Sequence, residues 1–124
     1  MKKLCTKWFK KWARKANLSD ENLLEAIENL ENGLSVADLG GNIYKVRVQR
    51  QGKGKSSGFR TIVVYRIEEK AIFLYGFGKN EKSNIDKQEL SYFKKLGSDL
   101  LALNEEQINN SIKKQILFDL EAGL

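Results

Sequence analysis

Residues 43–50 read IYKVRVQR, and here the hydrophobic pattern of the chain changes from helical to alternating. In an extended chain, Tyr44, Val46 and Val48 fall on one face, and Lys45, Arg47 and Gln49 fall on the other. Two further segments, FRTIVVYRI at 59–67 and AIFLYGF at 71–77, are rich in β-branched and aromatic residues, as strands are. The links between the three segments are short, so they predict an antiparallel meander.

Helical periodicity precedes these strands. Residues 7–16 predict an amphipathic helix capped by Thr6, with Trp8 and Trp12 as core anchors. A second helix is expected to follow the N-cap candidate Ser19, because acidic residues come directly after it. The segment between this helix and the first strand is interpreted as a loop.

Two more helices are expected after the strands. The third starts near Ser83, with Asp86 placed as the acid of a capping box. The fourth is opened by Asn104, apolar residues recur at every fourth position from Ile108 to Leu120, and Gly123 ends it. The sequence therefore predicts an α+β fold, in which a small antiparallel β-sheet of about three to four strands is packed by two N-terminal helices and by C-terminal helices.

The length of 124 residues fits one domain, residues 1–124, in which residues 104–124 form a C-terminal helical extension. No apolar run approaches the roughly 20 residues that span a bilayer, and the N-terminus lacks the apolar core of a signal peptide. The single cysteine, Cys5, fits a reducing environment. We therefore expect a cytoplasmic protein without membrane association.

The chain contains no histidine. This excludes histidine-based acid–base catalysis, nucleophile pairs that use histidine, and histidine-ligated metal sites. One cysteine cannot build a thiolate metal site. We expect no metal and no cofactor, so any catalysis falls to lysine, arginine, tyrosine, carboxylates and hydroxyls.

The net charge of +6 is concentrated in two blocks. Residues 1–15 carry seven cations and no acid, residues 16–39 carry six acids and no cation, and residues 40–66 carry seven cations and no acid. Basic blocks of this kind indicate a polyanionic partner, most simply a nucleic acid. A solvated basic surface is the alternative, and it stays open for the first block in particular.

The second basic block surrounds a loop, QGKGKSSG at 51–58. The loop is too short for a Walker A motif, and it joins two strands, although its amides and lysines suit phosphate. In an antiparallel hairpin, Lys45, Arg47 and Arg60 are expected on one side. The polar turn at 79–81 is expected to join them from the next strand.

These segments resemble the RelE/ParE superfamily of toxins from type II toxin–antitoxin systems, and the HigB-like branch most closely. The resemblance rests on YKVRV at 44–48, GFRTIVVY at 58–65 and GKNEKS at 78–83, and it extends over nearly the whole chain. It implies a RelE-like fold and cleavage of mRNA in the ribosomal A site. No metal is required when the 2′-hydroxyl of RNA attacks the adjacent phosphorus, which leaves a 2′,3′-cyclic phosphate and a 5′-hydroxyl.

The resemblance and the chemistry together suggest two groups of site residues. The candidates for catalysis are Arg60, Lys55, Lys79 and Glu81. The candidates for RNA binding are Lys45, Arg47, Lys53 and Asn80. Arginine matches phosphate oxygens, and a lysine among other cations has a lowered pKa and can act as a base. This chain has Asn80 and Asp86 where RelE typically has an arginine and a tyrosine.

The resemblance also implies partners. They are a cognate helix-turn-helix antitoxin, the ribosome and its mRNA, and operator DNA only through the antitoxin complex. Two alternatives stay open: a ParE-like toxin that inhibits DNA gyrase, and a nucleic-acid-binding domain without catalysis. The retained basic residues favour the nuclease over the gyrase inhibitor.

Overall fold

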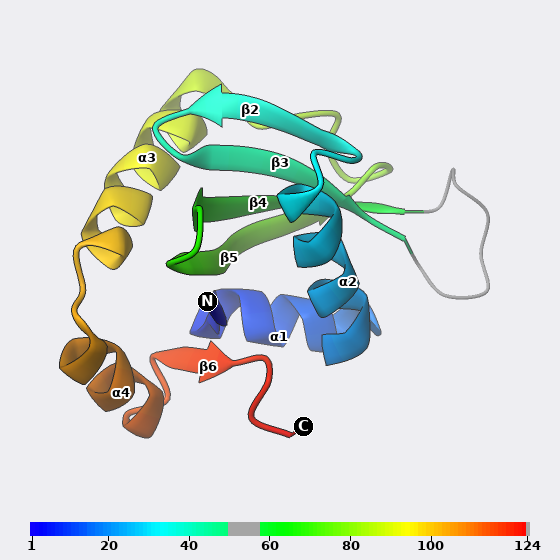
Figure 1. Cartoon of the computed structure of the whole chain (residues 1–124). Coiled ribbons are helices and arrows are strands. Elements are labelled where there is room, and N and C mark those ends of the chain that lie inside the picture. The colour runs from blue at the N-terminus through cyan, green and yellow to red at the C-terminus, as the bar shows by residue number, and fades with distance from the viewer. Residues whose placement is uncertain (50–57, 124) are drawn as a thin grey trace.

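A six-stranded sheet runs through the middle of the described part of the protein (Figure 1). The computed structural model describes residues 1–49 and 58–123. The strands lie in the order β2-β3-β4-β5-β1-β6. Their bounds are Lys2–Thr6 (β1), Val36–Gly40 (β2), Ile43–Val48 (β3), Phe59–Arg66 (β4), Lys70–Gly78 (β5) and Leu117–Asp119 (β6).

The predicted meander is confirmed, since β3, β4 and β5 pair antiparallel in sequence order. The remaining strands were not predicted. β2 forms a hairpin with β3, β1 pairs parallel with β5, and β6 pairs antiparallel with β1. The sheet is therefore mixed, and it is larger than the three to four strands expected.

Four helices flank the sheet in the described ranges, and the α+β class is confirmed. They are Lys7–Lys15 (α1), Asp20–Glu31 (α2), Lys87–Leu101 (α3) and Glu105–Lys113 (α4). The Thr6 hydroxyl accepts a hydrogen bond from the Phe9 amide at 3.2 Å, and Ser19 forms a capping box with Asn22, as these N-caps predict. None of the described helices is long and apolar enough to cross a membrane.

Two predicted helix boundaries were wrong. The third helix begins after Asp86, whose carboxylate caps the Glu89 amide, rather than near Ser83. The fourth helix ends at Lys113 instead of continuing past Leu120 to Gly123, because Gln115 adopts a left-handed backbone with a φ of 59°. After this turn the chain becomes strand β6, so the apolar repeat is shared between a helix and a strand.

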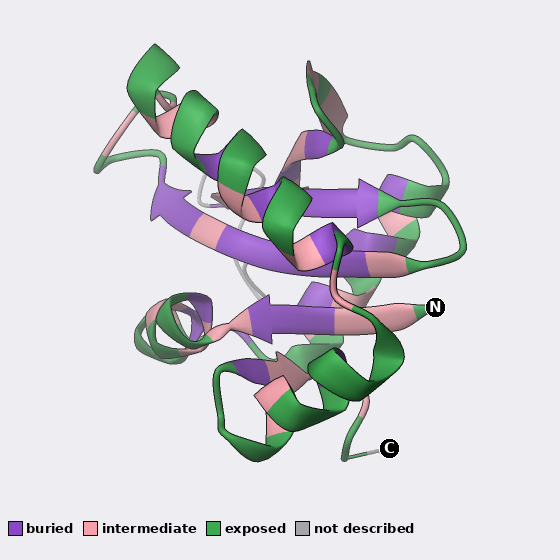
Figure 2. Cartoon of the chain, turned by 90° about the vertical axis from the view of Figure 1, so that its left-hand side faces the viewer, coloured by how far each residue is buried: buried purple, intermediate pink, exposed green. Residues whose placement is uncertain are grey.

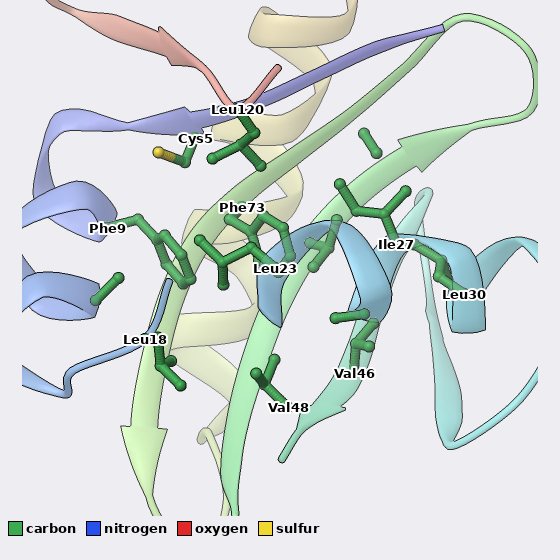
Figure 3. Close-up of a cluster of buried hydrophobic side chains, with 14 of the residues drawn as sticks. Cys5, Phe9, Leu18, Leu23, Ile27, Leu30, Val46, Val48, Phe73 and Leu120 are labelled. Atoms are coloured by element: carbon green, nitrogen blue, oxygen red, sulfur yellow. The ribbon is translucent and has the colours of Figure 1, made fainter. Parts of the chain in front are cut away.

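Helices cover both faces of the sheet. α1 and α2 pack on one face around Phe9, Ile27 and Phe73, and Figure 3 shows these side chains together. α3 and α4 pack on the other face, where Phe93 and Ile108 are buried. Figure 2 shows the buried residues following the strands between the helices. The alternation predicted for β3 holds, because Val46 and Val48 are buried on the α1–α2 face.

Cys5 is buried in this core beside Leu120, and burial raises the pKa of its thiol to about 12. Because the thiolate is the reactive form, we expect Cys5 to be inert towards the thiol reagent DTNB at pH 8 in the folded protein. The reaction is expected to be at least about 100-fold slower than in 6 M guanidinium chloride, where the thiol regains its ordinary pKa. Similar rates in the two conditions would contradict this burial.

Candidate functional site

Two rows of paired residues cross the α3 face of the sheet. One row joins Arg47 on β3, Arg60 on β4 and Phe77 on β5. The next row joins Lys45, Ile62 and Tyr75 in the same strand order. Directly paired residues in an antiparallel sheet have their side chains on the same face. Three predicted cations, Lys45, Arg47 and Arg60, therefore lie on one face, as expected from the sequence.

Within the described part of the chain, Arg60 is the cation of this face whose side chain shows a free donor for an anion. Its guanidinium has a buried nitrogen, Nη1, without a hydrogen-bond partner among the residues described. No described carboxylate forms an ion pair with Lys45, Arg60 or Lys79. Like charges directly opposite each other on neighbouring strands are unfavourable, and Arg47 is paired with Arg60. An anion between these groups would relieve the repulsion and satisfy the buried donor.

Lys45 lies one row further along the sheet and is half-buried. Its ammonium approaches the Asn84 side-chain oxygen at 3.5 Å. Asn84 Oδ1 also accepts a hydrogen bond from the Ile85 amide at 2.9 Å, which fixes the position of the side chain. Asn84 therefore holds the Lys45 ammonium beside the segment between β5 and α3. The sequence did not identify Asn84, because a helix was expected to begin at Ser83.

The turn after β5 carries three of the predicted site residues. Lys79, Asn80 and Glu81 are exposed, and the Glu81 amide donates to the Gly78 carbonyl at 3.1 Å. A Cβ atom on Gly78 would lie 3.5 Å from Glu81 Oε1 and 3.7 Å from the Phe59 ring. The Glu81 carboxylate therefore lies on the Phe59 side of the sheet, whereas Arg60 lies on the opposite side. Lys53 and Lys55 lie outside the described residues.

An ion pair closes the site on the side of α3. Lys82 donates to Glu89, and its ammonium lies 5.6 Å from the centroid of the Tyr75 ring. The hydrogen bond from Lys82 lowers the pKa of the Glu89 carboxyl, and the same bond raises the pKa of the Lys82 ammonium. This pair fixes the segment between β5 and α3. A seven-residue spacing across a helix start has no periodic signal, so the amino-acid sequence did not indicate this ion pair.

The pH dependence of this ion pair is testable with Glu89→Gln. The pKa of the Glu89 carboxyl is lower in the folded protein than in the unfolded chain, where it is about 4.3, so the ion pair stabilises the fold at pH values above about 4.3. This stabilisation is lost as the pH falls through the pKa of the folded state. The glutamine keeps the capping hydrogen bond to the Asp86 amide but loses the charge. We expect a melting temperature lower by about 1–3 °C at pH 7 and no difference at pH 2.5. Glu25→Gln, on the exposed face of α2, is the control, and equal losses at both pH values would contradict the assignment.

The chemistry of this site is that of anion recognition. Within residues 1–49 and 58–123, no group of three or more Cys, Asp or Glu residues is arranged to hold a metal ion. The cationic face carries lysine and arginine donors, which match the oxygens of phosphate groups.

One comparison with known proteins bears on this site. The model of a protein family described as "RelE toxin of RelE / RelB toxin-antitoxin system" matches residues 1–120. Among curated proteins, none matches the chain significantly. The family match extends from β1 through β6, so it includes every element that forms the cationic face.

Proposed function

The chain belongs to the RelE toxin family, whose model spans residues 1–120, and from this premise we propose that it is a ribosome-dependent mRNA endonuclease. RelE-family toxins are typically mRNA endonucleases and have a cognate antitoxin. We further propose that this toxin belongs to the HigB-like branch, a proposal supported by the GKNE turn at 78–81. Residues 1–124 would act as a single domain in the cytoplasm.

The observation that carries the proposal is the cross-strand pairing of Arg47 with Arg60. Two guanidinium groups on the same face repel each other, and Arg60 Nη1 has no partner among the described residues. A bound anion would satisfy this buried Arg60 donor, and the planar fork of a guanidinium matches the oxygens of a phosphate. The scissile phosphodiester of mRNA supplies that charge.

The proposed reaction is a transesterification within the RNA. A base removes the proton of the 2′-hydroxyl, and the oxygen attacks the adjacent phosphorus. The bond from phosphorus to the 5′-oxygen breaks, and this oxygen takes up a proton. The products are a 2′,3′-cyclic phosphate and a 5′-hydroxyl. Arg60 stabilises the additional negative charge on the phosphate oxygens during attack.

The proton transfers are assigned to lysines rather than to the carboxylate. Glu81 lies on the Phe59 side of Gly78 and would have to move around the end of β5 to reach a phosphate held by Arg60. Lys79 follows β5 directly, and Lys55 belongs to the loop that joins β3 to β4 in the sequence. A lysine amine within reach of the 2′-hydroxyl can take up its proton as a general base. Lys79 and Lys55 are therefore favoured over Glu81.

The remaining basic and polar candidates are proposed to position the RNA. Arg47 and Lys45 lie in neighbouring rows on the Arg60 face, so they can contact successive phosphates. Lys53 and Asn80 are proposed to extend this surface. The antitoxin is proposed to be of the helix-turn-helix type, with any contact to operator DNA made through the complex.

Primer extension on a reporter mRNA, after induced expression of the toxin, tests the proposal. We expect growth arrest together with new mRNA 5′ ends. These ends should carry a 5′-hydroxyl and should lie at positions that are in frame with the translated codons. In a purified translation system, a 2′-deoxy nucleotide placed at the cleavage site should abolish cleavage there, because the nucleophile is absent. Arrest without new mRNA ends would contradict the nuclease and indicate gyrase inhibition or binding without catalysis.

A further inference from the structure

An apolar groove opens on the side of β5 that β1 leaves uncovered. β1 pairs with β5 only as far as Phe73, and the chain then turns away into α1. Beyond this point the groove lies between the start of α1 and α3 and reaches the turn before β6, with a volume of about 680 Å³. Its lining includes Trp8, Tyr75, Tyr92, Leu96, Leu100 and Ile116.

The groove gathers large apolar side chains that the fold leaves in contact with water. Trp8 is 48% exposed, Tyr92 is 63% exposed and Ile116 is 53% exposed. The prediction that both tryptophans are core anchors is thus wrong for Trp8, which stacks on Tyr75 at 4.7 Å between ring centroids and has half its surface outside. Exposed apolar residues that cluster around one groove mark a binding surface.

The charges around the groove are mainly positive. Lys7 lines it directly, and Lys95 and Lys114 are exposed near the lining residues Leu96 and Ile116 in the sequence. Asp99, exposed beside Leu100, is the acid among these flanking residues. The one lining carboxylate among the described residues, Glu89, already accepts a hydrogen bond from Lys82. A matching occupant therefore presents apolar side chains to the floor of the groove and carboxylates to its rim.

We propose that this groove binds an acidic amphipathic segment of the cognate antitoxin. This inference rests on the proposed function, because membership of the toxin family is what implies an antitoxin as partner. It adds which surface of the toxin the antitoxin contacts and which side chains the antitoxin presents there. Trp8 and Tyr92 are the expected anchors, because buried aromatic residues dominate the affinity of such interfaces. Tyr75 on β5 separates the groove from Arg60 on β4, so the docked antitoxin segment would leave Arg47 and Arg60 uncovered.

Titration of full-length antitoxin into full-length toxin variants, followed by calorimetry, tests the docking site. Tyr92→Glu and Ile116→Glu place a carboxylate in a groove that receives carboxylates, and both side chains are exposed enough to replace without unfolding. We expect at least about 30-fold weaker binding for each. Tyr92→Lys also removes the aromatic ring but keeps the charge around the groove positive. It should therefore lose less affinity for the antitoxin than Tyr92→Glu.

Ile67→Glu is the matched control. Ile67 is 71% exposed in the turn between β4 and β5 and lies outside the groove, so its replacement should change affinity by less than about twofold. Antitoxin affinity within twofold of wild type for both groove variants would overturn the proposal. So would a toxin dimer that Tyr92→Glu dissociates, or an effect of the groove variants on mRNA cleavage alone. Because binding is measured without RNA, a failure of the nuclease proposal leaves this test unaffected.

Discussion

Replacement of Arg60 by glutamine is expected to lower the rate of mRNA cleavage by about 100- to 1,000-fold, the usual loss when a donor to developing negative charge is removed. Arg60→Lys should recover part of the rate, because it restores the charge without the two-pronged geometry of the guanidinium. The measurement is the rate at which new 5′-hydroxyl ends appear on ribosome-bound mRNA. Growth after induction is the corresponding test in cells.

Folding and catalysis should respond in opposite directions to this change. Arg60→Gln removes the repulsion with Arg47, so its melting temperature should equal or exceed that of the wild type. Arg66→Gln is the control within the same strand. Arg66 lies at the far end of β4, is exposed and pairs with Glu69 at 3.2 Å, so its loss should leave cleavage unchanged. Wild-type cleavage by Arg60→Gln would remove Arg60 from the site.

The largest effect on stability is expected for Gly76→Ala. An added Cβ would lie 2.3 Å from Trp12 Cζ3, with two more atoms of the same ring at 2.5 and 2.6 Å. The indole is held against Phe9 and Phe59, with ring centroids 5.3 and 5.4 Å away, so it cannot simply swing aside. Overpacking of this kind costs about 2–3 kcal/mol, which for a chain of this size lowers the melting temperature by about 10 °C.

A double-mutant cycle separates this clash from other effects of the substitution. In the background of Trp12→Ala, the Gly76→Ala change should be close to neutral, because the atoms that it meets are gone. Gly123→Ala is the control, since no heavy atom lies within 4 Å of its added Cβ, and thermal melts should show a change below about 0.5 kcal/mol. Equal losses from Gly76→Ala with and without Trp12 would contradict the close packing.

The sequence was most informative where the pattern is local. The alternation in 43–48 identified β3, and Thr6 and Ser19 identified two helix starts, because each depends on neighbours within a few residues. It also indicated that Lys45, Arg47 and Arg60 share a face, since a hairpin fixes which side chains are paired.

Long-range pairing was not predictable in the same way. β1 contains two lysines in five residues and owes its extended form to β5, where Lys2 pairs with Lys70. β6 has three residues and depends in turn on β1. Trp8 was wrongly assigned to the core and Asn84 was not identified for a related reason, because their surroundings are set by where α1 and α3 meet the sheet. A single sequence contains no local signal for such contacts.

The position of β1 between β5 and β6 also sets the order of events during synthesis. The first strand to leave the ribosome must wait until Lys70–Gly78 has been made before it gains its first neighbour, and until Leu117–Asp119 before it gains the second. At about 5–20 residues per second, the first delay is roughly 3–13 s. A nascent chain therefore holds an incomplete sheet until Leu117–Asp119 has been made.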